Sequence, residues 1–461
     1  MKPALIVLAA HEPLLDPRVD WGARLASHSR PVTVYGLDWG MTRKSLAPTY
    51  QTVRAKPHGI SWDFFSRGLV FFFGWNLFWA IPVFLILFPV VAFLVVVRLL
   101  VGRILAMVQR MPSLWKLFRN WGRAGSQWRV VAPFSEIRQF AYLIRHFLTS
   151  GSALLKGVEA NLQPGSRPIL HANDLDALVP AVLIKLRHGG SVIYDAHEFY
   201  PVQFVDPSKW FVWCFKWIER KCIAHCGEVF SVTPQLAQAM ADTYSSPKPY
   251  GYVPNASPID PGPLPLIKTD LPLKFIFQGN FTRGRGLSQL VRFWNQINTH
   301  GAHLYLRGPD SALKLELIED ARRHGTLDKS VFFLTPVQEL DLISSLEGFD
   351  VGVIPYEPVS INNRYCCPNK LSQYMQAGLA ILCNDLEFVK SVVNKYGCGK
   401  SYDATDRQTF EEAVRWWSAH PEELHKMKER GRAAALKEYN WETEGQKFVE
   451  AYDRVSMSSS S

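Results

Sequence analysis

Aspartate and glutamate are absent from residues 64–135 of this 461-residue chain. The same stretch contains eight lysines and arginines, which account for +8 of the formal net charge of +10. These cations are Arg67, Arg98, Arg103, Arg110, Lys116, Arg119, Arg123 and Arg129. The rest of the chain is nearly neutral, so the basic character belongs to one segment and not to the molecule as a whole.

Cysteine pairs and several common motifs are also missing. The seven cysteines include no CxxC pair, and Cys222 and Cys226 lack a second ligand pair at zinc-site spacing. We therefore expect reduced thiols and no metal site. No P-loop, GxSxG elbow, HExxH or dinucleotide fingerprint occurs, which excludes the usual NTPase, hydrolase, zinc protease and dehydrogenase interpretations.

Uncharged residues run without interruption from Leu69 to Val97, with Pro82 and Pro89 inside the run. A run of 29 residues favours contact with a membrane, and a buried core helix is the alternative. The prolines favour a bent, re-entrant or interfacial hairpin. The next segment, Arg103–Arg129, interleaves cations with tryptophans, as helices at an anionic lipid surface do; a solvated basic face or an RNA patch is the alternative. Because the lipid-like run is adjacent, we expect a membrane and no nucleic acid as the partner of residues 64–135.

Apolar runs of strand length alternate with helical patterns on both sides of this stretch. We expect strands at residues 4–10, 32–37, 168–171, 191–194, 229–232, 274–278, 304–307, 331–334, 351–355 and 380–383. Helices are expected at residues 19–26, 178–186, 313–323 and, with a break near 439–441, 422–456. Six prolines between Pro254 and Pro272 predict a linker. The fold class is therefore α/β, with two doubly wound Rossmann-like domains facing a cleft.

The domain boundaries follow from these patterns. We expect an N-terminal domain at 1–258, interrupted by a membrane-associating insertion at 64–150, and a C-terminal domain at 259–435. A helix and tail at 436–461 are expected to pack back toward the N-terminal domain. Both flanks of the insertion belong to one sheet, so both must lie on one side of the membrane. The apolar run that ends at Ala10 is too short for a signal peptide, so we expect peripheral or re-entrant monotopic attachment at the cytoplasmic face.

Eight short motifs occur in the order in which the family 4 retaining glycosyltransferases of GT-B fold carry theirs, and the chain resembles this family. The motifs are Asp16-Pro-Arg18-Val19, His171-Ala-Asn-Asp174, Tyr194-Asp195-Ala-His197-Glu198, Val253-Pro254-Asn255, Gln278-Gly279 with Arg283-Gly-Arg285-Gly286-Leu287, Pro368-Asn369-Lys370-Leu371, Tyr374-Met375-Gln-Ala-Gly378 and Tyr439-Asn-Trp441-Glu442. The resemblance covers about residues 1–55 and 168–450 and leaves the insertion unexplained.

The resemblance implies a UDP- or GDP-linked sugar donor held mainly by the C-terminal domain, an acceptor held by the N-terminal domain, and no obligatory metal or cofactor. Gly279 and Gly286 would permit close backbone approach, and Arg283 and Arg285 would supply cations for a diphosphate leaving group; a surface turn is the alternative for the two arginines. The expected catalytic residues are His197 and Arg285. Expected donor contacts are Gly279, Asn280, Arg283, Tyr365, Asn369, Lys370, Leu371 and Gln373, and expected acceptor contacts are Asp16, Arg18, Asp174 and Glu198. For the histidine and the acceptor-side residues, structural hydrogen bonding and loop capping are the alternatives.

Two positions depart from the family pattern. Many members place two glutamates eight residues apart around the Pro-Asn-Lys turn, where this chain has Tyr365 and Gln373. Neither side chain ionises at pH 7 as a carboxylate does. Gln373 can still hydrogen-bond a ribose, whereas Tyr365 would have to replace sugar contacts together with Asn369 and Lys370.

We therefore predict a metal-independent enzyme that transfers a hexose-type sugar from a nucleotide diphosphate to a lipid-linked acceptor at the cytoplasmic membrane face, in polysaccharide or glycolipid synthesis. The altered carboxylate positions leave open a catalytically inactive, membrane-bound scaffold, which a donor nucleotide would not stabilise. A nucleotide-sugar epimerase on the same fold is a further alternative, although such an enzyme would have no use for a lipid-facing insertion.

Overall fold

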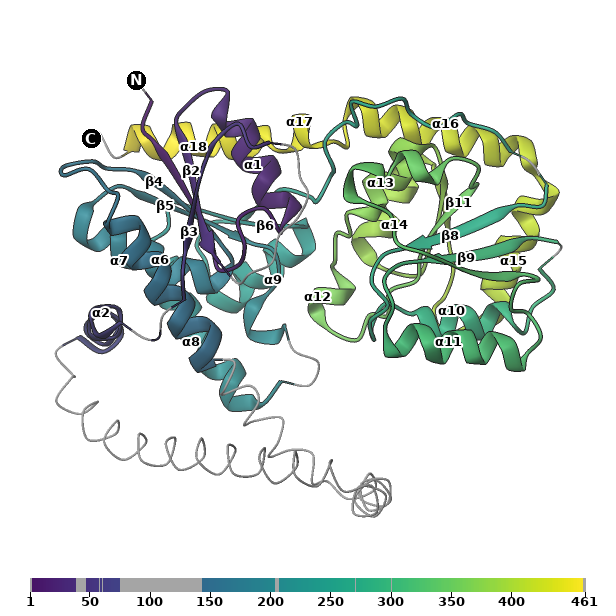
Figure 1. The fold of residues 1–461 in the computed structure, drawn as a ribbon, viewed down its shortest axis with the longest axis horizontal. Helices are drawn as coiled ribbons and strands as arrows, with labels where there is room; N and C mark the ends of the chain where they lie inside the picture. Colours follow the sequence, from purple (N-terminus) through teal and green to yellow (C-terminus); the bar gives the residue numbers. More distant parts are fainter. Residues whose placement is uncertain are drawn as a thin grey trace, which may run out of the picture.

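The computed structural model of the chain describes residues 2–38, 47–57, 59, 61–74, 143–203, 207–269, 271–299 and 301–458. These residues form two α/β units, each built on a parallel sheet (Figure 1). The predicted fold class of two Rossmann-like halves is confirmed.

The N-terminal sheet has the strand order β3-β2-β1-β4-β5-β6-β7. Its strands are β1 (Leu5–Ala9), β2 (Val32–Leu37), β3 (Gln51–Ala55), β4 (Ile169–Asn173), β5 (Ser191–Ala196), β6 (Glu228–Ser231) and β7 (Gly251–Tyr252). β1 pairs with β4 so that Val7 lies opposite His171. Segments from both sides of the long interruption therefore share one sheet, as predicted. The unpredicted strands β3 and β7 lie at the two edges, where the apolar pattern is weakest.

The C-terminal sheet has the order β10-β9-β8-β11-β12-β13. Its strands are β8 (Lys274–Gln278), β9 (His303–Arg307), β10 (Val331–Leu334), β11 (Val351–Ile354), β12 (Ala380–Cys383) and β13 (Gly399–Ser401). Five of these segments were predicted as strands. The sixth, β13, spans three half-buried residues and carries no apolar run for sequence analysis to find.

Helices cover both faces of each sheet, and in Figure 1 α10 and α11 lie on one side of the C-terminal strands while α13 and α16 lie on the other. The N-terminal helices are α1 (Pro17–Ser27), α2 (Trp62–Phe73), α6 (Thr149–Glu159), α7 (Asp174–His188), α8 (Lys209–Ile223) and α9 (Pro234–Tyr244). The others are α10 (Leu287–Trp294), α11 (Ala312–Arg323), α12 (Ile361–Arg364), α13 (Lys370–Ala377), α14 (Glu387–Tyr396), α15 (Arg407–Ala419), α16 (Pro421–Lys437), α17 (Trp441–Glu444) and α18 (Gln446–Ser458).

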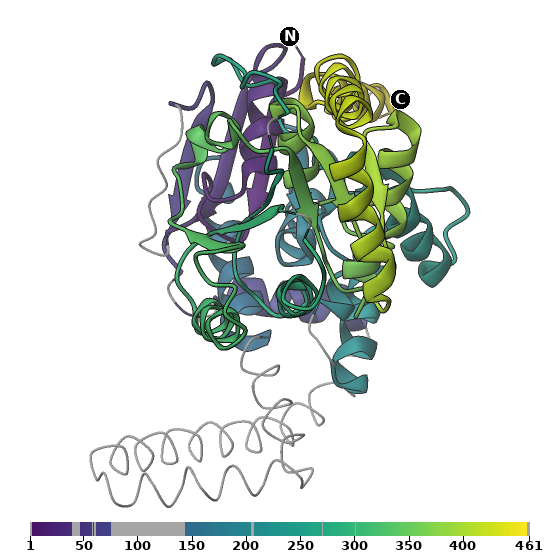
Figure 2. The ribbon, with the colours of Figure 1, turned by 90° about the vertical axis from the view of Figure 1, so that its right-hand side faces the viewer.

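The chain end crosses from the C-terminal domain back to the N-terminal one. α16 packs against α13, whereas α18 packs against α1, β4 and β5. Trp441, Phe448 and Tyr452 are buried on that side, and the Tyr452 hydroxyl lies 2.8 Å from His171 Nδ1. Figure 2 shows the N-terminus and the C-terminal helices at the same end of the molecule. The break predicted near residues 439–441 is the turn between α16 and α17.

The described residues of the proline-rich segment 254–272 contain neither helix nor strand. The segment is nevertheless anchored to the C-terminal domain, because the Ser257 amide donates to Ser372 Oγ at 2.8 Å and the Asp260 amide donates to Gln376 Oε1 at 3.0 Å.

The predicted insertion at 64–150 is described only at its ends, in α2 and in residues 143–150, so the membrane contact predicted for 64–135 falls largely outside the described residues. Within the described ranges, no helix combines the length and apolar character needed to cross a membrane. All seven cysteines are free in this structure.

Candidate active site

A cavity of about 630 Å³ lies between the two domains and is lined by the carboxyl ends of strands from both. The N-terminal domain contributes His197 and Glu198 after β5, and the C-terminal domain contributes Gln278 and Gly279 at the end of β8. Further lining residues include Asn280, Arg285, Tyr356, Asn362, Cys366, Asn369, Lys370 and Gln373. Parallel sheets leave polar backbone groups and loops at this edge, which is where doubly wound folds bind ligands.

Two cations converge on one tyrosine in the C-terminal wall of the cavity. Lys370 Nζ donates a 2.6 Å hydrogen bond to the Tyr356 hydroxyl, and the Arg285 guanidinium carbon lies 4.3 Å from the centre of the same ring. Among the described residues, neither cation forms an ion pair with a carboxylate. Burial, followed by the charge of Arg285, lowers the pKa of Lys370 well below its ordinary value. This wall therefore favours a ligand that brings its own negative charge.

Two glycines let the backbone approach this wall closely. Gly279 has φ +149°, and a Cβ there would meet Lys370 Nζ at 3.3 Å. Gly286, at the N-cap of α10, has φ +70°, and a Cβ there would overlap the Pro355 carbonyl oxygen at 1.6 Å. Only glycine fits this position, and its φ turns the chain so that α10 begins directly after Arg285.

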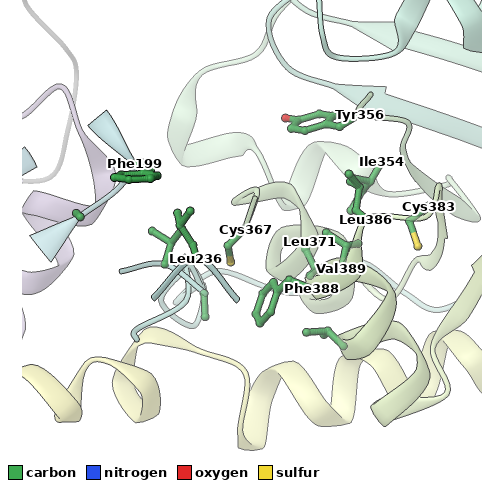
Figure 3. Packing of buried hydrophobic residues seen from close by; sticks show 14 of the residues in the cluster. Phe199, Leu236, Ile354, Tyr356, Cys367, Leu371, Cys383, Leu386, Phe388 and Val389 are labelled. Atoms are coloured by element: carbon green, nitrogen blue, oxygen red, sulfur yellow. The ribbon is translucent and has the colours of Figure 1, made fainter. Parts of the chain in front are cut away.

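Three of the expected donor contacts lie away from the cavity. The Arg283 side chain is 87% exposed and its nearest carboxylate, that of Glu316, is 3.9 Å away. Leu371 is fully buried in the core beneath α13, as Figure 3 shows. Tyr365 does not line the cavity; its backbone carbonyl accepts a 2.9 Å hydrogen bond from Thr233 Oγ1 of the N-terminal domain. The structure thus brings Gly279, Asn280, Asn369, Lys370 and Gln373 together with Arg285, but not these three residues.

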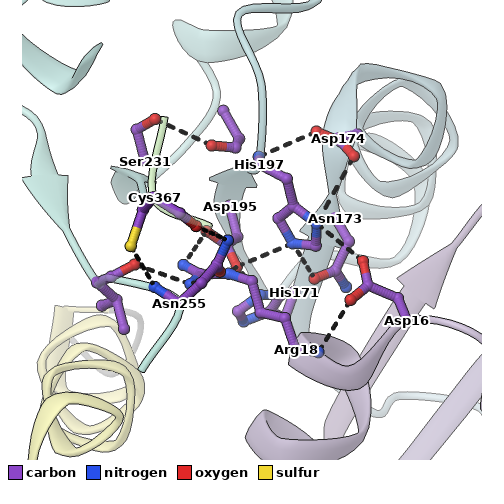
Figure 4. A network of polar contacts seen from close by, with 12 residues as sticks. Asp16, Arg18, His171, Asn173, Asp174, Asp195, His197, Ser231, Asn255 and Cys367 are labelled. Atoms are coloured by element: carbon purple, nitrogen blue, oxygen red, sulfur yellow. Dashed lines mark hydrogen bonds and ion pairs between the residues drawn. The ribbon is translucent and has the colours of Figure 1, made fainter. Parts of the chain in front are cut away.

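On the N-terminal side, His197 lies among acidic and amide groups (Figure 4). Its Nδ1 is 3.0 Å from Asp16 Oδ2, and its Nε2 is 3.2 Å from Asn173 Oδ1 and 3.3 Å from Asp195 Oδ2. The backbone amide of His197 donates a 3.0 Å hydrogen bond to Asp174 Oδ1. Both ring nitrogens therefore have partners within the protein.

The charges explain why this histidine is held as an imidazolium. Burial alone would lower the pKa of His197, but the carboxylates of Asp174, Asp16 and Asp195 raise it well above its ordinary value. The imidazolium in turn lowers the pKa of Asp16 against the effect of burial. With both ring nitrogens held by Asp16 and Asn173, the ring has no free donor in this conformation. His197 still lines the cavity, and its contact with the sugar stays a prediction.

Arg18 was expected to contact the acceptor, but the structure buries it behind the cavity. Its Nε and Nη2 donate to the two oxygens of Asp195 at 2.8 Å each, and its Nη1 donates to the Val253 carbonyl and to Asn255 Oδ1. Asn255 Nδ2 then donates to the Cys367 carbonyl of the C-terminal domain at 2.9 Å. Arg18 therefore connects strand β5 to the interdomain linker and is not free to bind a ligand.

Asp16 and Asp174 likewise do not line the cavity, and they contact it through His197. Glu198 does line it, and burial followed by the charge of Asp174 raises the pKa of Glu198, while Arg285 acts in the opposite direction. Of the expected acceptor contacts, Glu198 is the one whose carboxylate the structure presents at the cavity. Among the described residues, no group of histidines, cysteines and acids is arranged to hold a metal ion.

Sequence analysis missed three residues that matter in this site. The Tyr356 side chain contacts both cations of the donor wall. Asn362 forms hydrogen bonds across the cleft to Phe199, and Asn255 connects the linker to the C-terminal domain. Asn255 stands in a quoted motif, but the other two carry no local signal, because their importance arises only when two strand ends or two domains meet.

Comparisons with known proteins agree with this geometry. Residues 267–434 match the family model described as "Glycosyl transferases group 1". No curated protein sequence matches the chain significantly. The chain is similar in fold to sucrose-phosphate synthase from Thermosynechococcus elongatus, with 14% identity, a TM-score of 0.62, and 99% of this chain and 100% of that one covered.

Two further solved structures have the same architecture. Trehalose 6-phosphate synthase from Burkholderia multivorans shows 11% identity and a TM-score of 0.61, with 99% of both chains covered. HepE from Anabaena, solved in complex with UDP, shows 9% identity and a TM-score of 0.59, with 98% of this chain and 100% of that chain covered. Residues 267–434 thus resemble the group 1 glycosyltransferases, and the whole chain has the GT-B fold of these solved structures, with two parallel Rossmann-like sheets on either side of the cavity.

Proposed function

We propose that this protein is a glycosyltransferase that moves a hexose-type sugar from a UDP- or GDP-linked donor to a lipid-linked acceptor at the cytoplasmic face of a membrane, in polysaccharide or glycolipid synthesis. The observation that carries the donor part is the pair of cations, Arg285 and Lys370, that face the cavity from one wall without a carboxylate partner among the described residues. A protein of similar fold, HepE from Anabaena, was solved in complex with UDP, which supports a nucleotide as the ligand.

The arrangement explains how the chain would assist departure of the nucleotide. As the bond between sugar and diphosphate breaks, negative charge grows on the leaving oxygen. Arg285 and Lys370 are held in place by Tyr356 before any ligand arrives, so they stabilise this charge without first reorganising. Burial lowers the pKa of Lys370, and the approach of an anion would stabilise its charged form.

The acceptor side of the proposal rests on the opposite wall. Glu198 presents a carboxyl group to the cavity, and the His197 network fixes the loop that carries it. The support for a lipid-linked acceptor is the uncharged run Leu69–Val97, which interrupts this same N-terminal domain.

Sugar transfer from a panel of UDP- and GDP-sugars to membrane lipid extract tests the proposal, with detergent-solubilised full-length protein. We expect incorporation from one donor, and a fall of about 10²- to 10³-fold in Arg285→Ala. The matched control is Arg322→Ala on the exposed face of α11, which should keep full activity.

Nucleotide binding separates the enzyme from an inactive scaffold. UDP or GDP should raise the melting temperature of the active protein by mass action and should have less effect on Arg285→Ala. No incorporation from any donor, together with no thermal shift, would refute the proposed activity and favour the scaffold.

A further inference from the structure

Helices α2 and α8 lie side by side at the edge of the N-terminal domain, although more than a hundred residues separate them in the sequence (Figure 1). The Trp217 ring of α8 packs against Phe72 and Phe73 of α2, with ring centres 5.2 and 5.4 Å apart. The two helices therefore present one joint outer surface, which we call the α2/α8 face and define by Trp62, Val70 and Phe73 of α2 and Lys209, Trp213, Arg220 and Lys221 of α8.

Large apolar side chains on this face are left in solvent. Trp62 is 76% exposed and Trp213 is 70% exposed. Val70 and Phe73 of α2 are also exposed. None of these residues lines the cavity between the domains. Apolar side chains clustered in this way mark a surface that meets another phase or molecule.

The charged side chains that α8 contributes to the α2/α8 face are all positive. Lys209, Arg220 and Lys221 are exposed, and among the described residues none of them forms an ion pair. The one acid of α8, Glu219, points into the core, where Tyr194 donates to it at 2.6 Å and Tyr244 donates to its other oxygen. On α11, by contrast, Arg322 and Arg323 pair with acids of their own helix. The α2/α8 face thus combines indole rings with uncompensated cations.

We propose that the α2/α8 face is a docking surface for an anionic lipid bilayer. Tryptophan favours the headgroup region, where its ring is buried and its N–H stays hydrated, and unpaired lysine and arginine are attracted to anionic headgroups. Charge complementarity selects this occupant over a second copy of the chain, because two such faces would bring like charges together. The inference rests on the proposed membrane site of action and adds helix α8, which lies outside the uncharged run. It orients the domain that carries Glu198.

Co-sedimentation of the full-length protein with vesicles tests this inference. The vesicles are of phosphatidylcholine alone or with phosphatidylglycerol. The test variant combines Trp213→Ser, Arg220→Gln and Lys221→Gln, all at exposed positions of α8. The matched control combines Leu315→Ser, Arg322→Gln and Arg323→Gln on α11, where Leu315 is 66% exposed.

We expect the wild type to prefer the anionic vesicles and the α8 variant to lose at least about tenfold in partitioning to them, while the α11 control is unchanged. Equal binding of the α8 variant would overturn the docking surface and leave the proposed membrane site of action intact. No binding of the wild type to either vesicle would overturn both. Concentration-dependent dimers of the wild type that the α8 variant does not form would assign the face to a second copy instead.

Discussion

Lys370 shows at the residue scale how a binding site can cost stability. The folded chain lowers the pKa of Lys370 well below 10.5, so the unfolded chain holds the proton more tightly. The charged ammonium therefore destabilises the free protein at neutral pH, and this cost shrinks as pH rises toward the unfolded pKa. A bound diphosphate would reverse the cost by pairing with the ammonium.

Lys370→Met should accordingly raise the melting temperature of the free protein at pH 7, by about 1–3 °C, and the gain should fade toward pH 10. The same substitution should abolish most of the thermal shift caused by UDP or GDP. Scanning calorimetry across pH, with and without nucleotide, measures both effects. Lys390→Met, on the exposed side of α14, serves as the control. A lower melting temperature in Lys370→Met with an unchanged nucleotide shift would contradict this role.

His197 has the opposite linkage to pH. Because its folded pKa is raised, its contribution to stability is complete below the unfolded value near 6.5 and is lost as pH rises through the folded value. His197→Gln leaves Asp16, Asp174 and Asp195 without their cation and should cost about 3–5 kcal/mol near neutral pH.

Urea unfolding at several pH values checks the His197 prediction. The difference between wild type and His197→Gln should narrow at alkaline pH, whereas His425→Gln, on the exposed face of α16, should match the wild type throughout. A difference that does not vary with pH would mean that His197 acts by packing and not by charge.

At the scale of elements, α18 completes the N-terminal domain from the far end of the chain. Phe448 is buried there, with its ring centre 5.0 Å from that of His171 and 5.1 Å from that of Phe230. The Arg18 guanidinium carbon lies 5.3 Å from the same ring. The helix thus supports the strand ends from behind, on the side away from the cavity.

Phe448→Ala should destabilise the protein by about 3–5 kcal/mol, the range for removal of a buried aromatic ring. Met457→Ala, on the exposed side of the same helix, should change stability little. Thermal unfolding followed by tryptophan fluorescence compares the two. Similar melting temperatures for both variants would show that α18 is not needed for the packing of the N-terminal sheet.

At the scale of the whole molecule, the side-chain amide of Asn362 connects the N-terminal wall of the cleft to the C-terminal wall. Asn362 Oδ1 of α12 accepts a 2.7 Å hydrogen bond from the Phe199 backbone amide, and Asn362 Nδ2 donates a 3.2 Å hydrogen bond to the Phe199 carbonyl. Phe199 directly follows His197 and Glu198, so this pair of hydrogen bonds holds the N-terminal wall against the donor wall. Phe199 and Leu236 belong to the same hydrophobic cluster as Cys367 and Leu371 of the C-terminal domain, and Figure 3 shows Leu236 near Cys367.

Asn362→Ala would leave both backbone groups of Phe199 without these partners, at a cost of about 1–3 kcal/mol. We expect kcat to fall by about tenfold or more, with little change in the Kd for free nucleotide, because the cations of the donor wall stay in place. Steady-state kinetics and calorimetric titration separate the two quantities. Asn394→Ala, exposed on α14, is the control. A loss of nucleotide affinity equal to the loss in kcat would show that Asn362 shapes the donor wall itself.

Much of this architecture could be predicted from the sequence because buried parallel strands are nearly continuous apolar runs. The runs at 32–37, 274–278, 331–334 and 380–383 became strands with those same bounds. The edge strands β3 and β13 were not predicted, because half-buried strands lack continuous apolar runs. In the site, a motif could say that Arg283 and Arg285 both follow a strand, but not that the first points to solvent and the second to Tyr356.

The sequence by itself determined the two α/β halves, the linker, the family resemblance and the one-sided placement of charge, because these depend on local pattern and composition. Only the tertiary structure decided which polar residues meet. It places the Arg18 side chain in hydrogen bonds to the start of the linker, surrounds His197 with carboxylates, and brings Lys370 and Arg285 into contact with the same residue, Tyr356. The physical reason is that pKa values, hydrogen-bond partners and exposed faces depend on groups brought together from distant parts of the chain, and their distances exist only once the two sheets have packed.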